Sequence, residues 1–254
     1  MSSVEEHALA ACSRLADECA AILQRCLVSA ILHGSLTQDD FRPGLSDIDL
    51  LLIVDRALTS GQVDGLVSAV DRADLGPAGG VDLLVVTRQA AATPGEHPDR
   101  ELMVGRWPGS DDQLEVAGRE KQVSDLWPEL SEIRANGRAL MGPGPGEVIG
   151  EVPGHRVRAN SVGWLRTWLK LTDDDKNAVH MVLTACRMWR FELTGEHTSK
   201  TAAARWALGR EPSLTAVDLA LLARATSHPR PIAPHDVEDV LRRVLRDLDG
   251  DAPD

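Results

Sequence analysis

Apolar residues form short continuous runs in the first part of this chain. Three such runs lie at 28–32, 47–54 and 81–86, the second of them behind two carboxylates. Runs that do not alternate with polar residues are typical of strands covered on both faces. They therefore predict three strands, with the second near the centre of a sheet. The segment 101–107 is too short for its pattern to decide between helix and strand.

Apolar residues at helical spacing predict the other elements. Around the strands this spacing predicts helices at 4–27, 60–74 and 120–140. Later in the chain it predicts five helices in a compact bundle, at 157–171, 175–193, 199–208, 213–226 and 234–248. Hydroxyl side chains favour helix N-caps, so caps are expected at Ser60, Ser199 and Ser213.

Glycine and proline mark the expected domain boundary. The stretch 142–154 holds five Gly and three Pro, which interrupts both kinds of pattern. The sequence therefore predicts an α+β protein with a mixed-sheet domain at 1–150 and an all-α helical bundle at 151–248. Residues 249–254 are expected to form a disordered tail.

A turn and two carboxylates lie close together between the first two strands. His33-Gly34-Ser35 ends the first strand, and Asp47 and Asp49 follow after an eleven-residue gap. Residues two apart on a strand point to the same face, so the two acids should lie together. Such a pair suits Mg²⁺, which prefers oxygen ligands that it shares with substrate phosphates. Gly34 lets a bound group approach the backbone, and Ser35 offers an N–H and a hydroxyl.

A third acid, Asp82, lies inside the apolar run of the third strand. A buried charge without a partner is costly, so this side chain is expected to face a cavity. The alternative is an edge strand on which Asp82 is exposed.

Charge narrows the classes of partner. The chain has 39 Asp and Glu against 27 Lys and Arg, for a net charge of −12. Proteins that bind nucleic-acid backbones normally present basic surfaces, so a long nucleic acid is disfavoured. An acidic cleft would instead attract a polycationic small molecule. The sequence shows neither a run of about 18 apolar residues nor a signal peptide. We therefore expect a cytoplasmic monomer with no membrane partner.

The turn and acid pair resemble the motif of the nucleotidyltransferase superfamily, which is shared with DNA polymerase β. Further stretches are similar to the aminoglycoside 3″/9 adenylyltransferases, the streptomycin and spectinomycin resistance enzymes. These stretches are 100–107, 182–189, 194–200 and 204–207. The resemblance covers roughly residues 25 to 210 and implies a polymerase β-like sheet domain followed by a helical domain, with the site between them.

The resemblance also implies roles for individual residues. Asp47 and Asp49 would hold Mg²⁺, expected as two ions, with ATP as the co-substrate. Asp82 falls where the family typically has a Glu that takes the proton from the substrate hydroxyl. Because Asp is shorter, it would serve either as this catalytic base or as a third metal ligand. The expected nucleotide-binding residues are Gly34, Ser35, Ser46, Asp125, Arg187 and Lys200.

Four residues are implied on the antibiotic side. Trp107 and Trp168 match pocket positions where an indole packs on a sugar ring or a guanidinium. Asp173 would face the cationic drug. Asn177 falls where the family has an aspartate, so one anionic contact is neutralised here.

The sequence therefore predicts transfer of AMP from ATP to a hydroxyl of an aminoglycoside-type antibiotic, streptomycin, spectinomycin or both. One alternative keeps nucleotidyl transfer but changes the acceptor to another small molecule, a protein side chain or an RNA end. A second alternative is a nucleotide-binding or antitoxin-like partner without turnover. The presence of all three carboxylates favours an enzyme.

Overall fold

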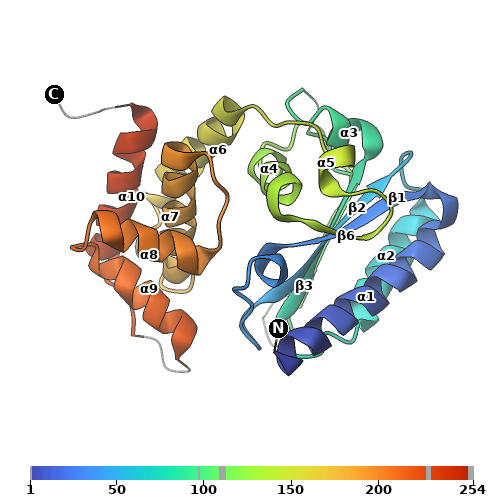
Figure 1. The fold of residues 1–254 in the computed structure, drawn as a ribbon, viewed down its shortest axis with the longest axis horizontal. Helices are drawn as coiled ribbons and strands as arrows, with labels where there is room; N and C mark the ends of the chain where they lie inside the picture. The colour runs from blue at the N-terminus through green and yellow to red at the C-terminus, as the bar shows by residue number, and fades with distance from the viewer. Residues whose placement is uncertain (1, 97, 109–112, 227–229, 251–254) are drawn as a thin grey trace. The chain divides into compact units, whose positions relative to one another are not determined.

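The first unit, Met1–Pro153, is built on a six-stranded mixed sheet (Figure 1). The structure, a computed structural model, describes residues 2–96, 98–108, 113–226 and 230–250. The strands are β1 Leu27–His33, β2 Asp47–Val54, β3 Gly80–Thr87, β4 Leu102–Arg106, β5 Leu114–Ala117 and β6 Arg138–Met141. They lie in the order β5-β4-β3-β2-β1-β6. β2 and β3 run parallel, and the other pairs are antiparallel.

Helices cover both faces of this sheet (Figure 1). α1 Ser3–Leu23 and α2 Ser60–Arg72 pack on the face that carries the main apolar core. On the other side lie α3 Arg88–Ala92, α4 Leu126–Asn136 and α5 Pro145–Val148. Two short 3₁₀ turns, η1 Gln24–Cys26 and η2 Gly34–Thr37, flank β1.

β2 is a central strand, as its unbroken apolar run predicted. Its even-numbered residues from Ile48 to Val54 join the core beneath α1 and α2. Leu51 and Ile53 point to the opposite face and are equally buried. β3 lies between β2 and β4 and is not an edge strand, so the alternative that placed Asp82 on an exposed edge strand is wrong.

The helix predicted at 120–140 is wrong at both ends. α4 covers only 126–136, and residues 138–141 form the edge strand β6 instead. The chain turns at Gly137, where an added Cβ would lie 2.5 Å from the carbonyl oxygen of Ile133. A residue with a side chain would clash in this turn, so glycine suits the position at which α4 ends. Neither β5 nor α3 had been predicted.

Two of the three predicted helix caps are also wrong. Thr59, not Ser60, caps α2, because its side chain accepts a hydrogen bond from the backbone of Gln62 at 3.3 Å. Ser199 caps α8 as predicted, and accepts from the backbone N–H of Ala202 at 3.2 Å. Ser213 makes no such cap, since α9 has Leu214 at its N-cap position.

The second unit, Gly154–Asp254, is a helical bundle with five helices in its described part. They are α6 Gly154–Trp168, α7 Ala178–Thr194, α8 Lys200–Arg210, α9 Thr215–Ala225 and α10 Pro234–Asp249. α7 contacts each of the other four. Its Trp189 is fully buried and donates from Nε1 to Asp247 of α10 at 2.6 Å. The α+β class, a mixed-sheet unit followed by a helical unit, is confirmed.

The boundary between the units falls after residue 153, three residues beyond the predicted one. Asp249, predicted to begin a tail, still belongs to α10. The end of that predicted tail, 251–254, lies outside the described residues. Across the described ranges, no helix is both long enough and apolar enough to cross a membrane.

Candidate active site

The predicted acids lie in neighbouring positions on one face of the sheet. Asp49 of β2 is directly opposite Asp82 in the parallel register with β3. Asp47 lies two residues earlier on β2 and therefore points to the same side. All three residues are half-buried. The structure thus brings together the three carboxylates that the sequence singled out.

Trp107 lies along this acidic face because two glycines leave room for its ring. A Cβ added to Gly80 or to Gly105 would meet the indole at 2.4 Å or 2.1 Å. From its position over these two glycines, the indole Nε1 donates a hydrogen bond to Oδ2 of Asp47 at 3.2 Å. Trp107 therefore both packs on the sheet and orients one of the proposed metal ligands.

The turn after β1 approaches the acid pair closely. Gly34 has φ +69°, a left-handed conformation, and a Cβ there would lie only 1.9 Å from Oδ2 of Asp49. Glycine is required at this position for both reasons. Ser35 follows, and its buried Oγ has no hydrogen-bond partner in the described part of the chain. Ser46 is engaged differently, because its Oγ accepts from the backbone N–H of Arg42 at 2.9 Å.

Mutual repulsion and burial raise pKa values in this acidic cluster. Burial, followed by the charges of Asp47 and Glu115, raises the pKa of Asp82 to about 6. Glu115 lies on β5 opposite Gly105, which is itself opposite Asp82, so the three form a row across the sheet. A carboxyl group with a pKa near neutrality can exchange a proton with a substrate.

Helix α4 adds two acids, Glu129 and Glu132, that were not predicted from the sequence. Burial, then the charges of Asp82, Asp49, Glu132 and Asp125 in that order, raise the pKa of Glu129 to about 8. Asp125 is exposed at the N-cap position of α4, without a side-chain cap bond. Spacings of four and three residues could have placed these acids on one helix face.

The donor set fits a divalent cation that also binds phosphate. In the described ranges no three His, Cys, Asp or Glu side chains converge as a complete metal site. Asp47 and Asp49 nevertheless supply hard oxygen ligands on one face, and the like charges around them are the arrangement that a cation relieves. Mg²⁺ is commonly held by one or two carboxylates plus substrate phosphates, so two protein ligands suffice.

In the second unit, basic and hydroxyl side chains share one face of α7. His180, Thr184 and Arg187 follow one another at helical spacing, and Lys200 begins α8. Burial and the charges of Lys200 and Arg187 lower the pKa of His180 to about 4, although the residue is partly exposed to solvent. Burial and Arg187 likewise lower the pKa of His197 to about 4. At neutral pH both imidazoles are uncharged, so Arg187 and Lys200 carry the positive charge.

Two hydroxyls in this unit lack hydrogen-bond partners among the described residues. They are the buried Oγ1 atoms of Thr184, on α7, and Thr198, just before α8. Unsatisfied buried hydroxyls beside two cations are suited to an anionic ligand. Sequence reasoning identified the cations but missed these hydroxyls and both histidines.

The predicted antibiotic-side residues of this unit are only partly brought together. Trp168 packs against the edge of His180, with ring centroids 5.9 Å apart, and against Trp164 at 5.7 Å. Asp173 is exposed in the segment between α6 and α7. Asn177 donates from Nδ2 to the carboxylate of Asp174 at 2.7 Å, so its amide is engaged at the start of α7.

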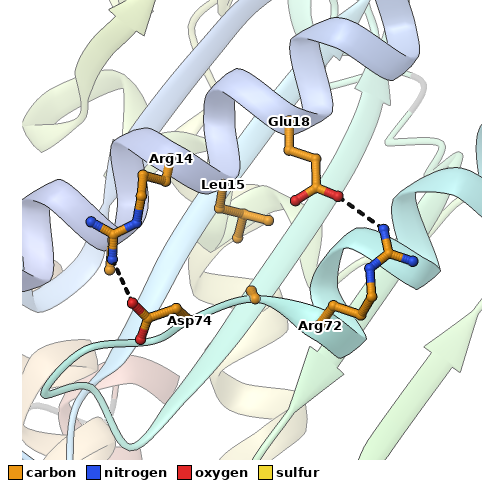
Figure 2. A pocket seen from close by; sticks show the side chains of 7 residues that line it. Arg14, Leu15, Glu18, Arg72 and Asp74 are labelled. Carbon is orange, nitrogen blue, oxygen red and sulfur yellow. Dashed lines mark hydrogen bonds and ion pairs between the residues drawn. The ribbon is translucent and has the colours of Figure 1, made fainter.

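A small pocket between α1 and α2 does not belong to this chemistry. Its volume is about 200 Å³, below the roughly 300–1,000 Å³ of most small-molecule sites. Figure 2 shows the two ion pairs that cross it, Arg14 with Asp74 at 2.8 Å and Arg72 with Glu18 at 3.0 Å. The charges of these side chains neutralise one another, so the pocket is a gap between two packed helices and not a ligand site.

Comparisons with known proteins agree with both units. Residues 12–126 match the model of the nucleotidyltransferase domain, and residues 147–245 match that of the C-terminal domain of aminoglycoside adenylyltransferase. The chain is 28% identical over 203 residues to a spectinomycin 9-adenylyltransferase of Staphylococcus aureus, covering 76% of each. It is 26% identical over 205 residues to the enzyme of that name from Campylobacter jejuni, covering 75% of this chain and 74% of that one.

A solved structure has the same fold. It is that of spectinomycin adenyltransferase AAD(9) from Enterococcus faecialis with ATP and spectinomycin. The TM-score is 0.74 and the identity 18%, with 95% of this chain and 99% of the other covered. At this identity the likeness extends to the fold alone.

Proposed function

Because the chain belongs to the aminoglycoside adenylyltransferase family, we propose that it transfers AMP from ATP to a hydroxyl of spectinomycin, and also of streptomycin. The observation that carries this proposal is the acidic face of the first unit. There Asp47, Asp49 and Asp82 lie beside a glycine turn that nothing larger than glycine can form. Two alternatives, another acceptor and a non-catalytic nucleotide binder, become outcomes of the test below.

Asp47 and Asp49 are the residues that would hold Mg²⁺. When bound, the ion neutralises phosphate charge and helps to align the attacking and leaving oxygens. Trp107 supports this role, because its hydrogen bond orients the carboxylate of Asp47. Asp49 lies close to Gly34, where an added Cβ would come within 1.9 Å of its Oδ2.

We assign the triphosphate to the polar groups that the family resemblance implies. Gly34 permits close approach of the turn, and the hydroxyl of Ser35 is buried without a partner in the described part. Arg187 and Lys200 supply positive charge, and the phosphate oxygens can accept bonds from both. Ser46 and Asp125 complete the proposed nucleotide site, Ser46 by closing the loop that leads into β2.

The acceptor hydroxyl attacks the α-phosphorus of ATP, and the bond to the β-phosphate breaks, so pyrophosphate leaves. Asp82 takes the hydroxyl proton, a role that its pKa of about 6 supports. Trp107, Trp168, Asp173 and Asn177 are assigned to the antibiotic. The carboxylate and indole groups suit the guanidinium groups of streptomycin, which pair with acids and stack on aromatic faces.

The test is a transfer assay with ATP, Mg²⁺ and a panel of aminoglycosides, followed by pyrophosphate release and by the mass of the antibiotic. We expect spectinomycin and streptomycin each to gain one adenylyl group. Omission of Mg²⁺ and the variant Asp49→Asn are the controls. Pyrophosphate release without a modified antibiotic would point to another acceptor. ATP binding without turnover on any substrate would favour the non-catalytic alternative.

A further inference from the structure

One buried carboxylate contacts both ends of the Gly34–Thr37 turn. Glu132 lies on α4 and is only 5% exposed. Its Oε1 accepts a hydrogen bond from Nε2 of Gln38 at 2.5 Å, and its Oε2 lies 3.9 Å from Nδ1 of His33. His33 directly precedes the turn and Gln38 directly follows it. The carboxylate therefore spans the turn from outside.

The turn has little internal support. It is a four-residue 3₁₀ segment. The backbone bond that closes it, from Gln38 to the carbonyl of Ser35, is long at 3.4 Å, and the same carbonyl accepts from the backbone of Asp40, outside the turn, at 3.1 Å. Short 3₁₀ turns have poor hydrogen-bond geometry in general. A side-chain bond from Thr37 to the carbonyl of Gly34 adds one local contact at 3.1 Å. The direction of Ser35 therefore depends on how the flanking residues are held.

The contact between Glu132 and Gln38 has a fixed polarity. An ionised carboxylate only accepts hydrogen bonds, so Gln38 must turn its NH₂ group toward Glu132. A hydrogen bond to a charged acceptor is stronger than one between neutral groups. The other end of the amide, Oε1 of Gln38, is buried and has no hydrogen-bond partner within the described ranges. Glu132 thus sets the orientation of Gln38.

Burying this carboxylate has an electrostatic cost. It also adds negative charge to a region that is already acidic, as its contribution to the raised pKa of Glu129 shows. An apolar residue of similar size would fill the same space without burying a charge.

We propose that Glu132 is a positioning residue for the nucleotide: through Gln38 and His33 it holds the Gly34–Ser35 turn in the orientation that receives the triphosphate. It acts through these residues and makes no contact with the reacting atoms. The inference rests on the proposed function in one respect, namely that the turn binds ATP.

The experiment compares Glu132→Ala, Gln38→Ala and the double variant. For Glu132→Ala we expect KM for ATP to rise roughly tenfold, while kcat and KM for spectinomycin change by less than about threefold. If both residues act through one contact, the double variant should be no weaker than the worse single variant. Glu132→Gln retains an acceptor for Gln38 and should recover most of the ATP affinity.

A second buried carboxylate provides the matched control. Glu101 is 7% exposed, and Arg119 pairs with it through its guanidinium. Glu101→Gln should lower Tm and leave KM for ATP unchanged. Two results would overturn the proposal: an unchanged KM for ATP in Glu132→Ala, or a fall in kcat and a rise in both KM values that simply follow the loss in Tm. Calorimetric measurement of ATP binding without antibiotic tests the role of Glu132 separately from the proposed reaction. If the wild type binds ATP but modifies no antibiotic, only the proposed reaction is contradicted.

Discussion

Gly34→Ala is the most informative single change, because the structure gives its consequences in two separate ways. The left-handed φ of +69° costs a residue with a Cβ about 1–2 kcal/mol. The new methyl group would also lie 1.9 Å from Oδ2 of Asp49. Cβ atoms essentially never approach another atom within 3.0 Å, so the carboxylate must retreat by about 1 Å. A displacement of this size at a reacting site can reduce the rate by roughly 100-fold.

The control is Gly76→Ala, which shares the backbone cost but not the collision. Gly76 has φ +57°, and its Cβ would meet nothing closer than 3.5 Å. Both variants should lose roughly 2–8 °C in Tm, as expected for 1–2 kcal/mol in a chain of this size. Only Gly34→Ala should lose roughly 100-fold in kcat for pyrophosphate release with spectinomycin. Equal activity in the two variants would refute the close approach of Gly34 to a functional Asp49.

Three further predictions concern the assigned side chains. Asp47→Asn and Asp49→Asn should each lower kcat by roughly 100-fold or more, while circular dichroism shows an intact fold. Near wild-type activity in either variant would exclude that residue from the metal site. Asp82→Ala should abolish transfer but retain calorimetric ATP binding, and Asp82→Glu should stay active if the residue is the base but not if it is a metal ligand. Trp168→Ala and Asp173→Ala should each weaken streptomycin transfer roughly tenfold more than spectinomycin transfer in kcat/KM, and equal losses on both drugs would contradict the guanidinium contact.

The sequence predicted the parts of the fold in which local pattern and tertiary position agree. The three apolar runs became β1, β2 and β3 because strands covered on both faces need apolar residues at every position. The edge strands were missed because a strand that is not covered on both faces needs no continuous apolar run. β5 exposes Leu114, Glu115 and Val116, so its sequence does not alternate between buried and exposed positions. β6 continued the apolar spacing of the preceding helix, and the chain leaves that helix at Gly137 to pair with β1.

The site was predicted to the extent that it lies in one stretch of sequence. Asp47 and Asp49 could be paired because a strand fixes the direction of residues two apart. Asp82 could be suspected because a charge inside an apolar run is exceptional. Nothing in the sequence placed Glu129 or Glu132 beside them, since α4 packs against the turn only through tertiary structure. Their identification required the folded chain.

The clustered carboxylates of the acidic face serve the proposed function at a cost in stability. Burial, and after it the charges of neighbouring carboxylates, raise the pKa of Asp82 and Glu129, which means that the folded protein holds their negative charges at a cost in free energy. An ion pair kept for stability would give the opposite result, since loss of one partner leaves a buried charge unbalanced. Neutralising a member of this cluster should therefore leave Tm unchanged or raise it, even where activity disappears. A cluster that weakens the free protein, and that the proposed cation would relieve, is the pattern expected where stability has been given up for catalysis.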